Sequence, residues 1–137
     1  MSTTPMSWFA CRKFIKQAKK DLERFSSIML MAKEKHRCID TGVPVFVQIE
    51  QYYEVIKELL IALLLKEGFK SRNHECLIAY LKEYHQELQQ EVLVIHELKN
   101  TRNDIQYEAF MPPQDYLDRN KSSFERIIVL LELLVRE

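Results

Sequence analysis

The stretch from Tyr52 to Phe69 reads YYEVIKELLIALLLKEGF and decides the fold class. Its apolar residues recur at helical spacing but wrap widely around the axis, which is typical of a helix buried on most sides. Gly68 follows the last apolar turn, and glycine commonly ends helices because it tolerates a left-handed backbone. The sequence therefore predicts a central, buried helix over about residues 45–67.

Four more helices are predicted around this one. Upstream, an apolar seam that repeats every seven residues from Trp8 predicts one long amphipathic helix over about 7–36, which Asp40–Pro44 separates from the central helix. Downstream, the pattern predicts a helix capped by Ser71 or Asn73, followed by helices over about 88–108 and 115–136. Short connections make an all-α, five-helix up-and-down bundle the expected architecture.

Composition supports one domain over residues 1–137, with residues 1–6 expected to be flexible. The chain has 137 residues with only two glycines and four prolines, which is too few turn formers for a β-sandwich or barrel. The most apolar run, Leu59–Leu65, is much shorter than the roughly 20 residues of a membrane span, so we expect no membrane contact. We also expect no metal and no cofactor, because metal-ligand and phosphate-loop motifs do not occur.

Charge is distributed unevenly along a chain whose formal net charge is zero. Residues 1–40 carry nine Lys and Arg against four acidic residues, a surplus of five, so residues 41–137 carry 11 against 16. The exposed basic stripe of Arg12, Lys16 and Lys19 predicts contact with a nucleic-acid backbone. A solvated helix face, or a helix paired with the rest of the fold, remains the alternative interpretation.

The three cysteines, Cys11, Cys38 and Cys76, are odd in number and lack Cys-x-x-Cys spacing. Such a set indicates neither a disulfide framework nor a zinc site. We therefore expect reduced thiols and a cytoplasmic protein.

The helix expected over 88–108 carries an unusual charged residue. Arg102 falls on the apolar stripe of Ile95, Leu98 and Ile105, and a permanently charged guanidinium on an inward face needs an anion, a ligand or a subunit boundary. The alternative is a simple ion pair with Glu97, with Asp104 or with a glutamate from a neighbouring helix. His96, Asn100, Asn103 and Tyr107 line up on the neighbouring stripe.

Three consecutive segments resemble the HEPN domain family, whose members are small all-α domains of higher eukaryotes and prokaryotes. The stretch Ile95–Tyr107, IHELKNTRNDIQY, resembles the signature helix of that family; Tyr52–Phe69 resembles its central helix, and Ser71–Glu75 the polar opening of its third helix. The resemblance implies a nucleotide- or RNA-binding homodimer that is often encoded beside a minimal nucleotidyltransferase, a possible partner.

Catalytic members of the family carry a histidine four to six residues after the arginine, and two protomers bring these pairs together in a metal-independent ribonuclease site. Here Tyr107 stands five residues after Arg102. Because phenol titrates at about 10 and imidazole at about 6.5, tyrosine is a poor general base at neutral pH. His74 and His96 are the histidines that we consider as substitutes, with His74 preferred because cationic neighbours and a helix N-terminus favour its neutral form.

We therefore predict a HEPN-like binding module without catalytic activity. Arg102 would hold a phosphate, Asn103 would contact the ligand through its amide, and Tyr107 would donate a hydrogen bond or stack on a base. His96 and His74 complete the expected nucleotide or RNA site. The alternative is a ribonuclease toxin of a toxin–antitoxin pair that uses Arg102 with His74 or Tyr107.

Overall fold

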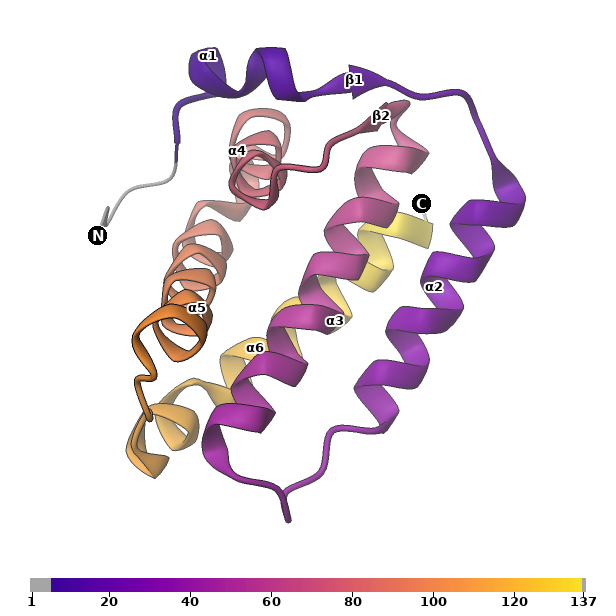
Figure 1. Cartoon of the computed structure of the whole chain (residues 1–137). Helices are drawn as coiled ribbons and strands as arrows, with labels where there is room; N and C mark the ends of the chain where they lie inside the picture. Colours follow the sequence, from indigo (N-terminus) through magenta and orange to yellow (C-terminus); the bar gives the residue numbers. More distant parts are fainter. Residues whose placement is uncertain (1–5, 137) are drawn as a thin grey trace.

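The computed structural model describes residues 6–136, and over this range the chain is an all-α bundle with one small two-stranded sheet (Figure 1). The α-helices are α1 (Trp8–Cys11), α2 (Leu22–Arg37), α3 (Val45–Lys66), α4 (His74–Tyr84), α5 (Gln89–Glu108) and α6 (Gln114–Arg136). Short 3-10 turns cover Arg12–Phe14 and Gln86–Leu88, and the strands are β1 (Lys16–Gln17) and β2 (Phe69–Lys70). The predicted all-α helical bundle is confirmed.

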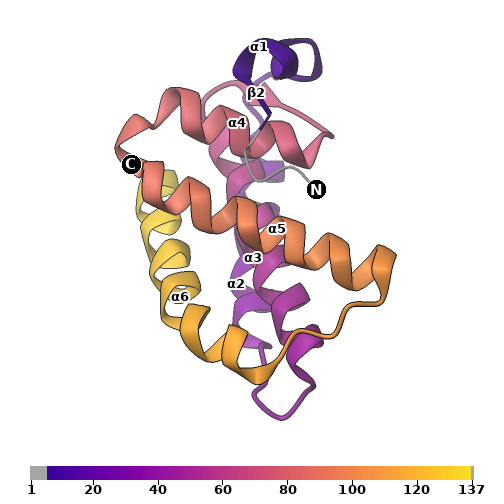
Figure 2. The same cartoon turned by 90° about the vertical axis from the view of Figure 1, so that its left-hand side faces the viewer.

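Helix α3 is the centre of the bundle, as its apolar pattern predicts. Thirteen of its 22 residues are buried, and α2, α4, α5 and α6 all pack against it. Figure 2 shows α4 and α5 lying across α3, whereas α2 and α6 run alongside it. The fully buried side chains Ile56, Leu63 and Phe124 belong to this core.

The ends of the helices follow local backbone chemistry. After α3 the backbone turns at Gly68, whose φ of 94° lies in the left-handed region, as expected. Asn73 caps α4 by accepting a hydrogen bond from the backbone N–H of Cys76, so of the two predicted caps this one is used. Helix α5 is capped by Ala109, whose φ of 53° lies in the left-handed region. Pro112 and Pro113 follow shortly after it.

The long helix predicted over 7–36 is wrong. The structure instead has α1, a 3-10 turn and β1 before α2 begins at Leu22. Asp21 accepts a hydrogen bond from the backbone N–H of Arg24 and so starts a new helix, while Leu22, which the seven-residue seam placed inside, is 66% exposed. The seven-residue spacing does not indicate one helix here, because its apolar residues belong to two segments. The first segment packs on α4 and the second on α3.

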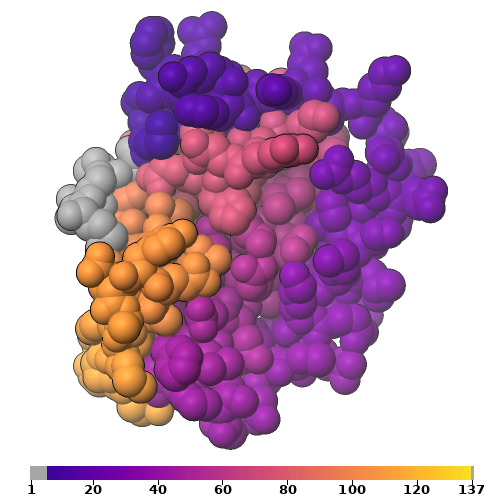
Figure 3. Space-filling model, viewed as in Figure 1, coloured from indigo at the N-terminus to yellow at the C-terminus, as the bar shows by residue number. Residues whose placement is uncertain are grey.

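Residues 6–21 form a separate layer that we call the N-terminal arm. Figure 3 shows this arm lying over α4 and β2 at one end of the molecule. A disulfide between Cys11 and Cys76 joins it to α4, so the expectation of reduced thiols is wrong for these two residues. Cys38 is an exposed free thiol. Because disulfides are rare in the cytosol, the cytoplasmic location remains only a prediction.

Further contacts hold the arm in place beside the disulfide. Trp8 packs edge-on against Tyr80 and Tyr84, and β1 pairs with β2 in an antiparallel register. Met6, the last residue of the segment expected to be flexible, donates its backbone N–H to Glu75; residues 1–5 lie outside the described range.

Between residues 6 and 136, no helix combines the length and apolarity needed to cross a bilayer. Over the same residues, no three His, Cys, Asp or Glu side chains lie close enough together to hold a metal ion.

Candidate functional site

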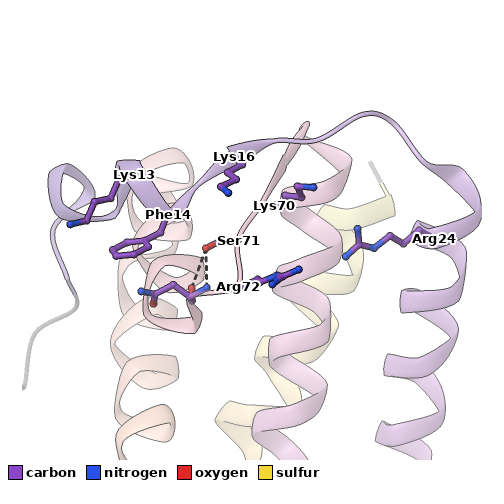
Figure 4. A pocket seen from close by; sticks show the side chains of 8 residues that line it. Lys13, Phe14, Lys16, Arg24, Lys70, Ser71 and Arg72 are labelled. Carbon is purple, nitrogen blue, oxygen red and sulfur yellow. Dashed lines mark hydrogen bonds between the residues drawn. The ribbon is translucent and has the colours of Figure 1, made fainter.

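A basic hollow lies where the arm, α2 and the β2–α4 connection meet (Figure 4). Its volume is about 770 Å³, within the usual range for ligand sites. We call it the basic hollow, and the residues that line it are Lys13, Phe14, Lys16, Arg24, Lys70, Ser71, Arg72 and Asn73. Five of these eight residues are cationic and none is acidic, so the hollow is suited to an anion.

The small sheet places two of these cations side by side on one of its faces. Lys16 of β1 is the register partner of Lys70 of β2, and side chains of such partners lie on the same face of a sheet. The pairing is extended by the Ala18 backbone N–H, which donates to the Gly68 carbonyl at 2.9 Å. Like charges directly opposite each other destabilise a strand pair, so packing alone gives no reason for this arrangement.

The other three cations belong to a 3-10 turn, to the first turn of a helix and to the β2–α4 connection. Arg24 lies in the first turn of α2, and Figure 4 shows its side chain extending toward Lys70 and Arg72. Arg72 sits in a tight turn closed by the Asn73 N–H, which donates to the Ser71 hydroxyl at 3.1 Å. Segments far apart in sequence therefore present their charges to one space.

These cations differ from many others in the protein in having no ionic partner. Lys35, Lys57 and Lys99 each contact a glutamate. Within residues 6–136, no carboxylate oxygen lies within 4.0 Å of a charged nitrogen of the five cations of the hollow. Their field is therefore neutralised only by solvent ions, which a phosphate can replace.

Basic character continues beyond the hollow itself. An adjoining cavity is lined by four cations and one acidic residue, namely Lys19, Lys20, Arg24, Lys70 and Asp21, and another by Arg12 and Lys13 with Phe9 and Phe14. The predicted basic stripe of Arg12, Lys16 and Lys19 is therefore part of a longer surface. The contribution of Arg24, Lys70 and Arg72 was missed, because nothing in the sequence shows that β2 pairs with the arm.

Arg102, the residue on which the predicted site depends, is partly buried and forms no ion pair at contact distance, although its charge helps to lower the pKa of Glu54 on α3. Its guanidinium carbon lies 5.2 Å from the centre of the Tyr53 ring, and its Nη1 donates to the Asn103 side-chain oxygen at 3.4 Å. Among residues 6–136, no carboxylate oxygen lies within 4.0 Å of it, so the alternative of a direct ion pair with Glu97, Asp104 or a glutamate of a neighbouring helix is not realised.

His74 contacts the hydroxyl group of Tyr53. Its Nδ1 is 3.2 Å from the Tyr53 hydroxyl oxygen, so Tyr53 contacts both His74 and Arg102. Burial lowers the pKa of His74, and the positive charges of Lys57 and Arg102 lower it further. Both effects favour the neutral imidazole. His74 also lines a cavity that it shares with Arg24, Lys70 and Arg72.

The remaining predicted site residues have other surroundings. His96 is buried and its Nε2 lies 3.0 Å from Glu75, which also pairs with Lys99, so His96 is a structural residue that joins α5 to α4. Tyr107 is 76% exposed and lies five residues beyond Arg102, which turns its side chain about 140° away around the helix. The structure thus brings His74 and Arg102 together and leaves Tyr107 apart.

No protein-family model matches the chain, and neither a curated protein nor a solved structure shows significant similarity to it. We therefore infer the function from the geometry of two places. One is the basic hollow, and the other is the Tyr53 cluster, which we define as Tyr53, His74 and Arg102.

Proposed function

We propose that this protein is a HEPN-like module that binds RNA through the basic hollow. The observation that carries the proposal is the convergence of five cations, from the arm, α2 and the β2–α4 connection, on a space that no acidic residue lines. The order of the helices and the motif around Arg102 support the family assignment within this proposal.

Phosphate is the ligand chemistry that this charge pattern favours. A phosphodiester between Lys16 and Lys70 would replace their mutual repulsion with two attractive contacts. Arg24 and Arg72 present planar guanidinium groups that can contact two phosphate oxygens each. A polymer is favoured over a mononucleotide because Lys19, Lys20 and Arg12 extend the basic surface past the hollow.

The salt dependence of binding to a labelled single-stranded RNA of 12 nucleotides tests the proposal. Each phosphate neutralised contributes about −0.7 to the slope of log K against log salt, so five contacts give a slope of about −3.5. The triple variant Lys16→Gln/Lys70→Gln/Arg72→Gln should lower the affinity and reduce the magnitude of the slope by about 2. Fluorescence anisotropy at several salt concentrations measures both quantities.

A matched control removes three charges elsewhere. Lys82, on α4, and Lys121 and Arg126, on α6, do not line the hollow, so their replacement by Gln should leave the slope close to that of the unchanged protein. Equal losses in both triple variants would show non-specific attraction. A protein that binds no RNA even at low salt would contradict the proposal outright.

The homodimer and the nucleotidyltransferase partner implied by the family resemblance belong to the same proposal. Arg102, partly buried and without a carboxylate partner, supports a boundary where a second chain or an anion approaches α5. Sedimentation equilibrium of the purified chain tests the dimer, and Arg102→Glu is expected to shift the population to monomer. A wild-type protein that sediments as a monomer at high concentration would remove the dimer from the proposal.

A second candidate function, ribonuclease activity, is favoured by the Tyr53 cluster. With Nδ1 protonated and donating to the Tyr53 oxygen, the Nε2 lone pair of His74 can accept the proton of an RNA 2′-hydroxyl. The 2′ oxygen then attacks phosphorus, the bond to the 5′ oxygen breaks, and that oxygen takes a proton from water. The hydroxide left behind takes the proton that His74 had accepted, which restores the neutral imidazole. Arg102 would stabilise the charge that develops on the phosphate oxygens.

Cleavage of a long RNA in the presence of a chelator distinguishes the two candidates. A ribonuclease would release fragments with 2′,3′-cyclic phosphate ends, and His74→Gln and Arg102→Gln would each abolish this release. His85→Gln is the matched control, because the His85 ring contacts Glu67 and no residue of the Tyr53 cluster. Binding without cleavage in the unchanged protein supports the binding module alone.

A further inference from the structure

Two exposed phenylalanines lie beside the basic hollow. Phe9 is 82% exposed and Phe14 is 40% exposed, although both belong to a short arm whose other aromatic residue, Trp8, packs inward against Tyr80 and Tyr84. Phenylalanine gains free energy when its ring leaves water, so an exposed ring in a fixed position is suited to contact a partner.

The positions of these rings connect them to the cations. Phe14 lines the basic hollow itself, and Figure 4 shows its ring beside the space that Lys16 enters from β1. Phe9 and Phe14 line the adjoining cavity together with Arg12 and Lys13. The Lys13 amine lies 5.2 Å from the centre of the Phe14 ring, so a cation and an aromatic face are presented as one unit.

We infer that the arm selects single-stranded nucleic acid, with bases stacked on Phe14 and Phe9 while the basic hollow holds the phosphates. This inference rests on the proposed function and specifies its ligand. Proteins that bind single strands combine a basic groove with aromatic side chains, because every unpaired base offers a flat face for stacking. In a duplex those faces are already stacked on each other, so the two phenylalanines gain nothing from it.

An anionic membrane surface is the other partner that basic and aromatic residues suit, and the geometry argues against it. The cations converge on a concave space, and Phe14 lines the wall of that space. A lipid headgroup layer is broad and flat, so it would contact the rim of the hollow and leave its inner cations unneutralised. A flexible strand, in contrast, can enter the hollow.

Anisotropy titrations with single-stranded and double-stranded RNA of the same sequence test the inference. Phe9→Ala/Phe14→Ala should weaken single-strand binding by about tenfold or more, since loss of one stacked base typically costs about fivefold or more and this variant loses two. The salt slope should stay unchanged, because no charge is removed. Duplex binding, weaker from the start, should be unaffected by the double variant.

Two further variants make the result specific. Phe110→Ala is the matched control, because Phe110 is 45% exposed but lies in the α5–α6 connection, at the other end of the bundle from the arm (Figure 1). It should bind like the unchanged protein. Phe14→Trp should retain or improve single-strand binding, since a larger ring stacks at least as well. Unaltered thermal melting in all variants is expected because these rings are exposed.

Failure of the inference can be told apart from failure of the proposed function. Salt-dependent RNA binding that is equal for single strands and duplexes, or that survives loss of both rings, would overturn the inference and leave the proposed function standing. Stronger binding to vesicles containing phosphatidylserine than to RNA would also overturn it, in favour of a membrane. Absence of any salt-dependent RNA binding would remove the proposed function, and the inference with it.

Discussion

The N-terminal arm and helix α3 are held in opposite ways. Thirteen residues of α3 are buried, whereas of residues 6–21 only Cys11 is. The arm depends on one covalent bond, a two-residue strand pair and the packing of Trp8. Burial of apolar surface therefore determines the bundle, while a few specific contacts hold the segment that completes the basic hollow.

The contacts that stabilise the fold and the residues of the candidate site therefore lie in different parts of the chain. Segments with few buried contacts open most easily, and binding sites are often formed by such segments. The arm supplies Lys13, Phe14 and Lys16 to the hollow, and α3 supplies none of its lining. Changes in the arm should therefore affect binding more than folding, unless they break the disulfide.

The largest effect is expected from removal of that disulfide. The chain-entropy relation gives about 4 kcal/mol for a bridge between cysteines 65 residues apart, so Cys11→Ser/Cys76→Ser should lose about that free energy of unfolding. Urea unfolding measures the loss. Cys38→Ser, at the exposed free thiol, is the control and should change little. An unchanged midpoint in the double variant would show that the bridge does not constrain the unfolded chain.

A smaller effect is expected from the centre of α3. Leu63 is 1% exposed, and Leu63→Ala removes buried methyl groups and leaves a cavity, which costs about 3 kcal/mol. Leu133→Ala on α6, where the side chain is 50% exposed, should cost less than about 0.5 kcal/mol. RNA affinity of the folded Leu63→Ala protein should be unchanged, and a specific loss of binding would contradict the separation of the two regions.

Glu75 of α4 connects the arm to α5, and its replacement should give an intermediate effect. Its carboxylate accepts the Met6 N–H and contacts His96 and Lys99. Burial alone would raise the pKa of Glu75, but Lys99 and His96 outweigh burial and the pKa lies below its usual value. Glu75→Gln should therefore cost about 2 kcal/mol at pH 7.

The pH dependence of this stabilisation has a definite sign. Because the pKa of Glu75 is lowered on folding, its contribution is complete above the ordinary glutamate pKa and is lost as the pH falls through the folded value. The difference in thermal melting between the protein and Glu75→Gln should therefore shrink below about pH 4.5. Glu83→Gln on the exposed side of α4 should show no such difference.

The smallest effect is expected from the Tyr53 cluster. Burial and the nearby cations lower the pKa of His74, so the unfolded chain binds a proton that the folded chain does not. Stability should therefore fall as the pH drops below about 6.5, and His74→Gln should remove this part of the pH dependence. Identical melting profiles from pH 7 to pH 5 for the two proteins would mean that His74 keeps its ordinary pKa when folded.

The bundle could be predicted from the sequence because its signals are local. The wide apolar pattern of Tyr52–Leu65, Gly68 and the Asn73 cap each depend on a few neighbouring residues, and the structure has them as expected. The arm could not be predicted, because its apolar residues mimic a heptad pattern while the pairing with β2 and Cys76 depends on contacts more than 50 residues away.

Only part of the candidate site could be predicted from the sequence. The sequence identified Lys16 as part of a basic stripe, and it identified Arg102 and His74 as residues whose charge state needs an explanation. It could not place Lys70 opposite Lys16, nor Tyr53 between His74 and Arg102, because both arrangements arise only when separate elements pack. Tyr107 is exposed and lies apart from the Tyr53 cluster, so its contact with a ligand stays a prediction.

The facing lysines of the small sheet imply a trade-off between durability and recognition. Because Lys16 and Lys70 repel each other, Lys16→Glu should make the empty protein melt at a higher temperature while it lowers the affinity for RNA. A sequence optimised for heat resistance alone would not retain this pair. Bound RNA should then protect the arm from proteases, since a phosphate between Lys16 and Lys70 replaces their repulsion with attraction to the ligand.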